Sequence, residues 1–414
     1  MRLESENQMF MTKKFFPICA LVAICTALSS VKAQQPGITG EDTASLRPIT
    51  TAVPFAAFTP DARSAALGDA GGALSPDANS VYWGAAKLAQ STKNYGVAVS
   101  YTPWLRNITD DMYFTYISGF VKVGKNQAFG ASLMYFDHGT FQARNGTGQN
   151  LGDFYSNEFY GSLAYSRKLT DKFSMGLNLK YINSNLAGSF VGNGMSIKPG
   201  SVVAGDISSY YKNDKKDEAT GKGWGTAFAA LIQNIGGKIN YGGDASGFIP
   251  TTLKLSGAAT RHIDSHNRIT FVMDLNKLMV PTPPVLNANG TIKSGKDPNR
   301  GTFAAMFGSF NDAPDGTSEE LKEFAISTGV EYWYNDAFAA RVGYFNEANS
   351  KGGRKFFTIG FGARIQERYG IDFAYLMPQK QGSPLANTFR ISLLVDMFKK
   401  QVEEAPEETE TTEE

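Results

Sequence analysis

Histidine is the residue type in this chain whose spacing most directly suggests chemistry. His262 and His266 lie four residues apart, a spacing that on a helix turns both imidazoles toward one metal ion. The flanking residues read as two strands joined by a tight turn, so we predict a polar turn at this position. The chain has 3 His in all, which leaves little material for a Ser–His–Asp site. We therefore expect no catalytic residue, no metal site and no cofactor, and we expect that the protein is not an enzyme.

Both cysteines, Cys19 and Cys25, fall in an N-terminal stretch that reads as an export signal. A basic start is followed by an apolar run and by residues suited to cleavage after Ala33. We predict a signal peptide over residues 1–33, with residues 1–10 as an upstream extension if translation starts further along. The mature chain would then contain no cysteine, so we expect neither disulfides nor a thiolate metal site.

Apolar and polar residues alternate along most of the chain after residue 94. In one clear example, Leu177 and Leu179 fall on one face of a predicted strand, and Asn178 and Lys180 fall on the other. Similar segments occupy residues 95–104, 111–123, 128–137, 158–167, 173–183, 202–211, 224–234, 251–262, 268–278, 323–334, 337–347, 355–365, 369–377 and 387–398. A chain that crosses lipid with strands must pair every backbone group in a closed sheet. The pattern therefore predicts an all-β transmembrane barrel of about 14 antiparallel strands over residues 95–398, in an outer membrane.

The connections between these segments alternate in length. The long ones, expected at the cell surface, include residues 138–157, 184–201 and 281–322, and the connections between them are mostly short, as expected for periplasmic turns. One connection on the short side, Lys212–Gly223, is long and charged and breaks this rule. The alternation otherwise favours a barrel over a soluble sandwich, which has no reason to follow it.

The charge balance argues against nucleic acid as a partner, and a cluster of acidic residues marks the C-terminal end of the chain. Lys and Arg total 40 against 39 Asp and Glu, so there is no basic field for nucleic acid. Residues 399–414 are rich in Glu and carry too few apolar residues to bury a face. We predict that this end is an acidic disordered tail.

Residues 34–94 are rich in Ala, Gly, Pro and Asp and lack strand alternation. Their distinctive residues are Asp61, Arg63, Gly68, Asp69, Gly71, Asp77, Asn79, Tyr82 and Trp83. In these residues the chain resembles the FadL superfamily of fourteen-stranded barrels and, within it, the PorV family of the type IX secretion system of Bacteroidetes. The resemblance implies a hatch, or plug, that folds into the barrel lumen. Its charged residues would pair there with lumenal charges such as Arg341 or Arg390, whereas the alternative is an ordered periplasmic loop.

The same resemblance implies a function in protein secretion. Such a protein binds the C-terminal signal domain of secreted cargo, receives it from the large translocon barrel and delivers it to the attachment complex with its signal-cleaving, sortase-like subunit. Its surroundings are outer-membrane lipid. We expect cargo to contact Met306, Phe307 and Phe310, an apolar cluster in the longest predicted loop. The alternative is a FadL-like channel for uptake of hydrophobic small molecules, although Gly84-Ala85-Ala86 replaces the Asn-Pro-Ala common in fatty-acid transporters.

Overall fold

The computed structural model describes residues 46–397 apart from residues 145–146, 187–190, 193–194, 197 and 244–245. The predicted signal peptide, the first part of the predicted hatch and the predicted acidic tail lie outside the described residues. No helix among the described residues is long and apolar enough to cross a bilayer.

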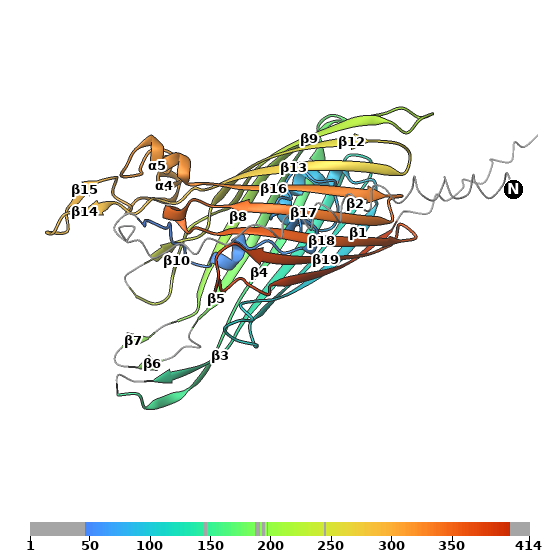
Figure 1. The fold of residues 1–414 in the computed structure, drawn as a ribbon. Helices are drawn as coiled ribbons and strands as arrows, with labels where there is room; N and C mark the ends of the chain where they lie inside the picture. Colours follow the sequence, from blue (N-terminus) through green and yellow to red (C-terminus); the bar gives the residue numbers. More distant parts are fainter. Residues whose placement is uncertain are drawn as a thin grey trace, which may run out of the picture. The chain divides into compact units, whose positions relative to one another are not determined.

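Fourteen antiparallel strands form a closed barrel, which confirms the predicted fold class (Figure 1). Each strand pairs with the next barrel strand in the sequence, and β1 pairs with β20 to close the sheet, with Tyr95 opposite Met397. The strands are β1 (Tyr95–Pro103), β2 (Tyr113–Val123), β3 (Gln127–Arg144), β4 (Asn150–Lys168), β5 (Phe173–Asn185), β8 (Gly200–Lys216), β9 (Gly223–Gly236), β12 (Thr252–His262), β13 (Asn267–Leu278), β16 (Phe324–Tyr334), β17 (Phe338–Asn346), β18 (Lys355–Ile365), β19 (Tyr369–Pro378) and β20 (Phe389–Met397).

The barrel buries polar side chains and exposes apolar ones. On β5, Leu179 is 60% exposed, whereas its neighbours Asn178 and Lys180 are 5% and 1% exposed. A water-soluble protein would reverse this pattern, because apolar surface is driven out of water. The strands therefore turn their apolar faces toward lipid and their polar faces toward the lumen.

Short turns join the strands at one end of the barrel, and longer connections that hold extra elements join them at the other (Figure 1). At the turn end, Asn335 and Asp336 both have positive φ, 52° and 51°, as a two-residue hairpin turn requires. Since β1 begins and β20 ends at this same end, we assign it to the periplasmic side and the long connections to the cell surface.

Two predicted connections are wrong in length. The predicted loop over residues 138–157 is mostly strand, because β3 continues to Arg144 and β4 begins at Asn150. Likewise, half of the predicted turn Lys212–Gly223 is strand, because β8 pairs with β9 as far as Lys216. Strands that project beyond the apolar zone have no reason to alternate apolar with polar residues, so the sequence pattern fades there while the backbone pairing continues.

Several long connections contain small elements of their own. Three are two-stranded sheets, formed by β6 (Val191–Gly192) with β7 (Met195–Ser196), β10 (Lys238–Asn240) with β11 (Ser246–Phe248), and β14 (Val285–Leu286) with β15 (Ile292–Ser294). The connection between β13 and β16 also carries α4 (Thr302–Gly308) and α5 (Thr317–Lys322), and η5 (Asn349–Lys351) lies between β17 and β18.

Candidate functional site

Residues 46–94, which we call the inner segment, pack against the lumenal faces of the barrel strands. The segment contains η3 (Pro54–Ala57), α2 (Ala62–Ala65), α3 (Ser80–Trp83) and η4 (Ala85–Gln90). Helix α2 packs on β18, β19 and β20, whereas η4 packs on β3, β4, β5 and β8, a different part of the barrel wall. The segment therefore contacts separate sectors of the wall. Its role as a hatch stays a prediction.

Two glycines of the inner segment allow this close packing. Gly68 has φ +68°, and a Cβ there would lie 2.4 Å from the backbone oxygen of Tyr344. A Cβ on Gly71 would lie 2.3 Å from the indole ring of Trp83. Gly68 needs glycine for both its positive φ and its lack of space, whereas Gly71 needs it for the lack of space alone.

A buried chain of charges links the inner segment to the wall. The Arg63 guanidinium donates to both carboxylate oxygens of Glu331, each at 2.9 Å. Glu331 also accepts from Arg341 at 2.8 Å, and Arg341 donates to Asp372 at 2.8 Å. Asp372 pairs in turn with Arg364 at 2.7 Å. Buried charges are stable only when paired in this way, so each member fixes the position of the next.

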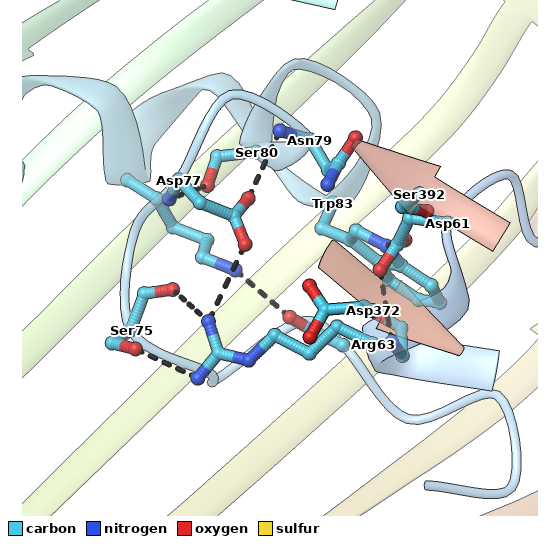
Figure 2. Close-up of polar contacts among 12 residues, drawn as sticks. Asp61, Arg63, Ser75, Asp77, Asn79, Ser80, Trp83, Asp372 and Ser392 are labelled. Atoms are coloured by element: carbon cyan, nitrogen blue, oxygen red, sulfur yellow. Dashed lines mark hydrogen bonds and ion pairs between the residues drawn. The ribbon is translucent and has the colours of Figure 1, made fainter. Parts of the chain in front are cut away.

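The remaining bonds of Arg63 fold the inner segment onto itself. Figure 2 shows its guanidinium between Ser75 and Asp77, with the Ser75 hydroxyl at 2.8 Å and the Asp77 carboxylate at 3.3 Å. The Asp77 carboxylate also accepts from the backbone N–H of Asn79 at 2.9 Å, and the backbone N–H of Asp77 donates to the Ser80 hydroxyl at 3.1 Å. One arginine thus connects two turns of the segment to a barrel strand.

Asp61 and Trp83 form a second contact within the inner segment (Figure 2). The indole Nε1–H of Trp83 donates to Asp61 at 2.6 Å, and the backbone N–H of Ser64 donates to the same carboxylate at 2.8 Å, which caps α2. Burial raises the pKa of Asp61, and the nearby Asp77 charge adds to this effect. Burial likewise lowers the pKa of Lys87 to about 8. The pKa values of Asp61 and Lys87 therefore depend on how the inner segment packs.

The predicted residues of the inner segment are brought close together, with one predicted ion pair confirmed. Asp69 pairs with Arg390 of β20 at 3.1 Å, as expected. Arg341, the other expected partner, pairs instead with Glu331 and Asp372 of the barrel wall. The Tyr82 hydroxyl donates to the backbone oxygen of Ala57 at 2.9 Å and so holds α3 to the start of the segment.

The cell-surface connection between β13 and β16 presents an apolar surface on its two helices. Phe303 and Phe307 of α4 are 67% and 68% exposed, and Phe310, which follows α4, and Leu321 of α5 are exposed in the same connection. We call these four side chains the α4 patch. Met306 is only 3% exposed, so its predicted role as a contact residue is wrong. Met306 and Ala305 both lie on the buried side of α4, whereas Phe303 and Phe307, four residues apart, lie on its exposed side.

The same connection takes part in a buried cluster of ion pairs that the sequence prediction missed. We call this cluster, formed by Lys277, Lys351, Glu319, Glu320 and Glu323, the ionic base. The Lys277 ammonium lies 2.5 Å from Glu323 and 3.2 Å from Glu320. The Lys351 ammonium lies 2.9 Å from Glu323 and 2.7 Å from Glu319. The only local signal was the acidic cluster on α5, whose basic partners come from distant parts of the chain.

The inner segment also reaches this base. Arg47 donates to both carboxylate oxygens of Glu319 at 2.9 Å and pairs with Asp315, and its backbone N–H bonds to Ser350. Burial alone would raise the pKa of Glu319, but the hydrogen bonds from Arg47 and Lys351 outweigh it and lower the pKa to about 2. Glu319 is therefore ionised at neutral pH, and its ion pairs join the inner segment, the helical connection and η5.

The two histidines of the opening motif have separate partners. His262 Nε2 lies 2.9 Å from Asp214, and His266 Nδ1 lies 2.9 Å from the Ser265 hydroxyl. They stand at opposite ends of the turn between β12 and β13, as the predicted polar turn requires. Within the described residues, no group of three or more His, Cys, Asp or Glu side chains is arranged to hold a metal ion.

Three solved structures are similar to this chain at low sequence identity. The toluene transporter TbuX of Ralstonia pickettii is 12% identical, with 81% of this chain and 98% of that chain covered and a TM-score of 0.43. The toluene transporter TodX of P. putida is 11% identical, with 82% and 99% covered and a TM-score of 0.46. A FadL homologue of Pseudomonas aeruginosa is 12% identical, with 85% and 99% covered and a TM-score of 0.41.

A comparison with curated proteins gives no match. A family model does match, over residues 41–285, and it describes the type IX secretion system protein PorV. The match takes in the inner segment and the barrel from β1 to β13, which is more than half of the 414 residues. The chain therefore belongs to the PorV family of type IX secretion system proteins.

Proposed function

We propose that this protein binds the C-terminal signal domain of secreted cargo at the outer membrane and carries it from the translocon barrel to the attachment complex. In that complex, a sortase-like subunit cleaves the signal. Membership of the PorV family supports a role in type IX secretion. The observation that carries the finer proposal is the α4 patch, which is exposed on the cell-surface side of the barrel.

The α4 patch has the composition of a protein-binding surface. It consists of two phenylalanines on α4, a third just after α4 and a leucine on α5. Exposed apolar groups that cluster in this way mark interaction sites, and aromatic side chains supply most of the binding energy in such sites. Because the ionic base fixes α5 before a partner arrives, less conformational entropy is lost there on binding. These features favour recognition of a folded cargo domain.

Uptake of hydrophobic small molecules is the competing function. It requires a path through the lumen, and the inner segment packs against several sectors of the lumenal wall through buried contacts such as Arg63–Glu331. We therefore place the uptake function second. If uptake were the function, changes in the α4 patch would leave secretion unaffected.

A double substitution tests the proposal. Phe303→Ser with Phe307→Ser should weaken binding of a purified cargo signal domain by at least about tenfold, the equivalent of about 1.4 kcal/mol. Leu286→Ser is the matched control, because Leu286 is an exposed apolar residue of β14 in the same connection but outside the patch. Binding is measured by titration with the detergent-solubilised protein, and cargo release is measured in cells.

Two outcomes would contradict different parts of the proposal, the location of the cargo site and the role in secretion. Unchanged binding by the double variant, with a correctly folded barrel, would exclude the α4 patch as the cargo site. Normal secretion of cargo after deletion of the whole gene would exclude the secretion function itself.

A further inference from the structure

The lipid-facing wall of the barrel contains an apolar hollow across β8, β9, β12 and β13. Its volume is about 650 Å³. Its floor includes the outward positions Gly257 and Ala259 of β12, and its sides include Phe228, Phe271 and Met273. We call this hollow the β12 trough. The trough lies on the outer surface of the barrel, because the alternate residues of β12, Ser256 and Ala258, are buried toward the lumen.

The strand register makes the trough run along β12. Gly257 lies opposite Phe228 of β9 and Met273 of β13. Ala259 lies opposite Thr226 of β9 and Phe271 of β13. Small residues in the middle strand are thus flanked by larger ones on both sides. With strands about 4.8 Å apart, the trough is about 10 Å wide between its bordering strands, which is enough for a hydrocarbon chain.

A positively charged side chain, that of Arg261, lies at the periplasmic end of the trough. Arg261 is the next outward residue of β12 after Ala259, and its guanidinium carbon lies 4.9 Å from the ring centre of Trp224. Trp224 is 58% exposed and lies directly opposite Arg261 in the register. Tryptophan is enriched where the apolar zone meets the headgroups. A guanidinium at that depth is suited to bind a phosphate through two parallel hydrogen bonds.

From this arrangement we infer that the β12 trough binds one glycerophospholipid of the periplasmic leaflet. Its acyl chain lies over Gly257 and Ala259, and its phosphate contacts Arg261. The charge complementarity selects a phospholipid over an uncharged lipid. This site is independent of the α4 patch, because it lies on the lipid-facing wall toward the opposite end of the barrel.

A second apolar hollow provides an internal control. It has a volume of about 430 Å³ and lies across β16 to β19, with Ala340 and Ala363 among its lining residues. The outward strand residues at its periplasmic end include Phe338, Ile365 and Tyr369, which carry no cation. It should therefore hold acyl chains without preference for a phosphate.

Native mass spectrometry of the full-length protein with added phosphatidylethanolamine or diacylglycerol tests the inference. The wild type should retain one phosphatidylethanolamine at least about fivefold more than diacylglycerol. Gly257→Leu should fill the trough and remove this retention, and it should fold, because an added Cβ meets only the Phe228 ring, at 3.7 Å. Ala340→Leu, which fills the second hollow, should retain the phospholipid as the wild type does.

Arg261→Gln separates headgroup binding from acyl-chain binding. It should reduce retention of phosphatidylethanolamine to the level of diacylglycerol, and it tests the inference even if Gly257→Leu fails to fold. Equal retention by Arg261→Gln and the wild type would overturn the inference. So would equal losses in folded Gly257→Leu and Ala340→Leu, or a wild type that retains both lipids equally.

Discussion

At the residue scale, Arg63 links the inner segment to the barrel through a buried ion pair with Glu331. Arg63→Met would leave the buried Glu331 with only Arg341 as a partner. Removing one member of a buried ion pair costs about 3–5 kcal/mol. We expect the barrel to remain assembled while amides of residues 62–90 lose hydrogen-exchange protection. Arg354→Met is the control, because the Arg354 side chain is 54% exposed and its pair with Glu347 contributes little. Equal protection in both variants would show that other contacts hold the segment.

Glu319 makes the ionic base sensitive to acid. The hydrogen bonds from Arg47 and Lys351 overcome the effect of burial and lower the pKa of Glu319 from the ordinary 4.5 to about 2. Such a carboxylate adds stability above its ordinary pKa and loses it as the pH falls toward its pKa in the folded protein. We therefore expect residues 312–323 to become accessible to protease between about pH 4.5 and pH 2. Glu319→Gln should show this accessibility already at neutral pH, and an acid profile matching the wild type would contradict the prediction.

At the scale of elements, the strands are defined by which face meets lipid. On β5, Leu179→Arg should destabilise the barrel by about 2–4 kcal/mol, because it places a charge in the apolar zone. Leu169→Arg, in the exposed turn before β5, should cost about 0–1 kcal/mol near the interface. Denaturant titration of refolded protein in lipid vesicles compares the two. Equal losses would show that the depth of Leu179 has been misjudged. Lumenal neighbours are poor controls, since Asn178 bonds to Asp206 in the packed interior.

At the scale of the whole molecule, the strand pairing that closes the barrel ends at Met397, before the predicted acidic tail. The register from Tyr95 opposite Met397 to Tyr101 opposite Ile391 joins the first strand to the last. A chain ending at Lys400 keeps all of these pairs. We expect it to insert and to migrate as a heat-modifiable barrel on gels, with the same unfolding midpoint as the full-length protein. Failure of this truncated chain to fold would show that the last residues are needed for assembly.

The sequence by itself determined the strands and the side of the barrel on which most connections lie. Each strand has lipid on one face and a polar lumen on the other, so its residues alternate with a period of two wherever it crosses the apolar zone. That signal is local and needs no knowledge of neighbouring strands. It fades where β3, β4, β8 and β9 leave the membrane, which is why residues 138–157 and 212–223 were predicted as connections.

Only the tertiary structure decided which residues meet. Arg63 and Glu331 are 268 residues apart in sequence, and no local pattern specifies their pairing. The burial of Met306, the partners of Glu319 and the small residues that form the β12 trough likewise depend on register and on packing between distant segments. The physical reason is that alternation fixes the face on which a side chain lies, whereas closure of the barrel around the inner segment fixes its partner.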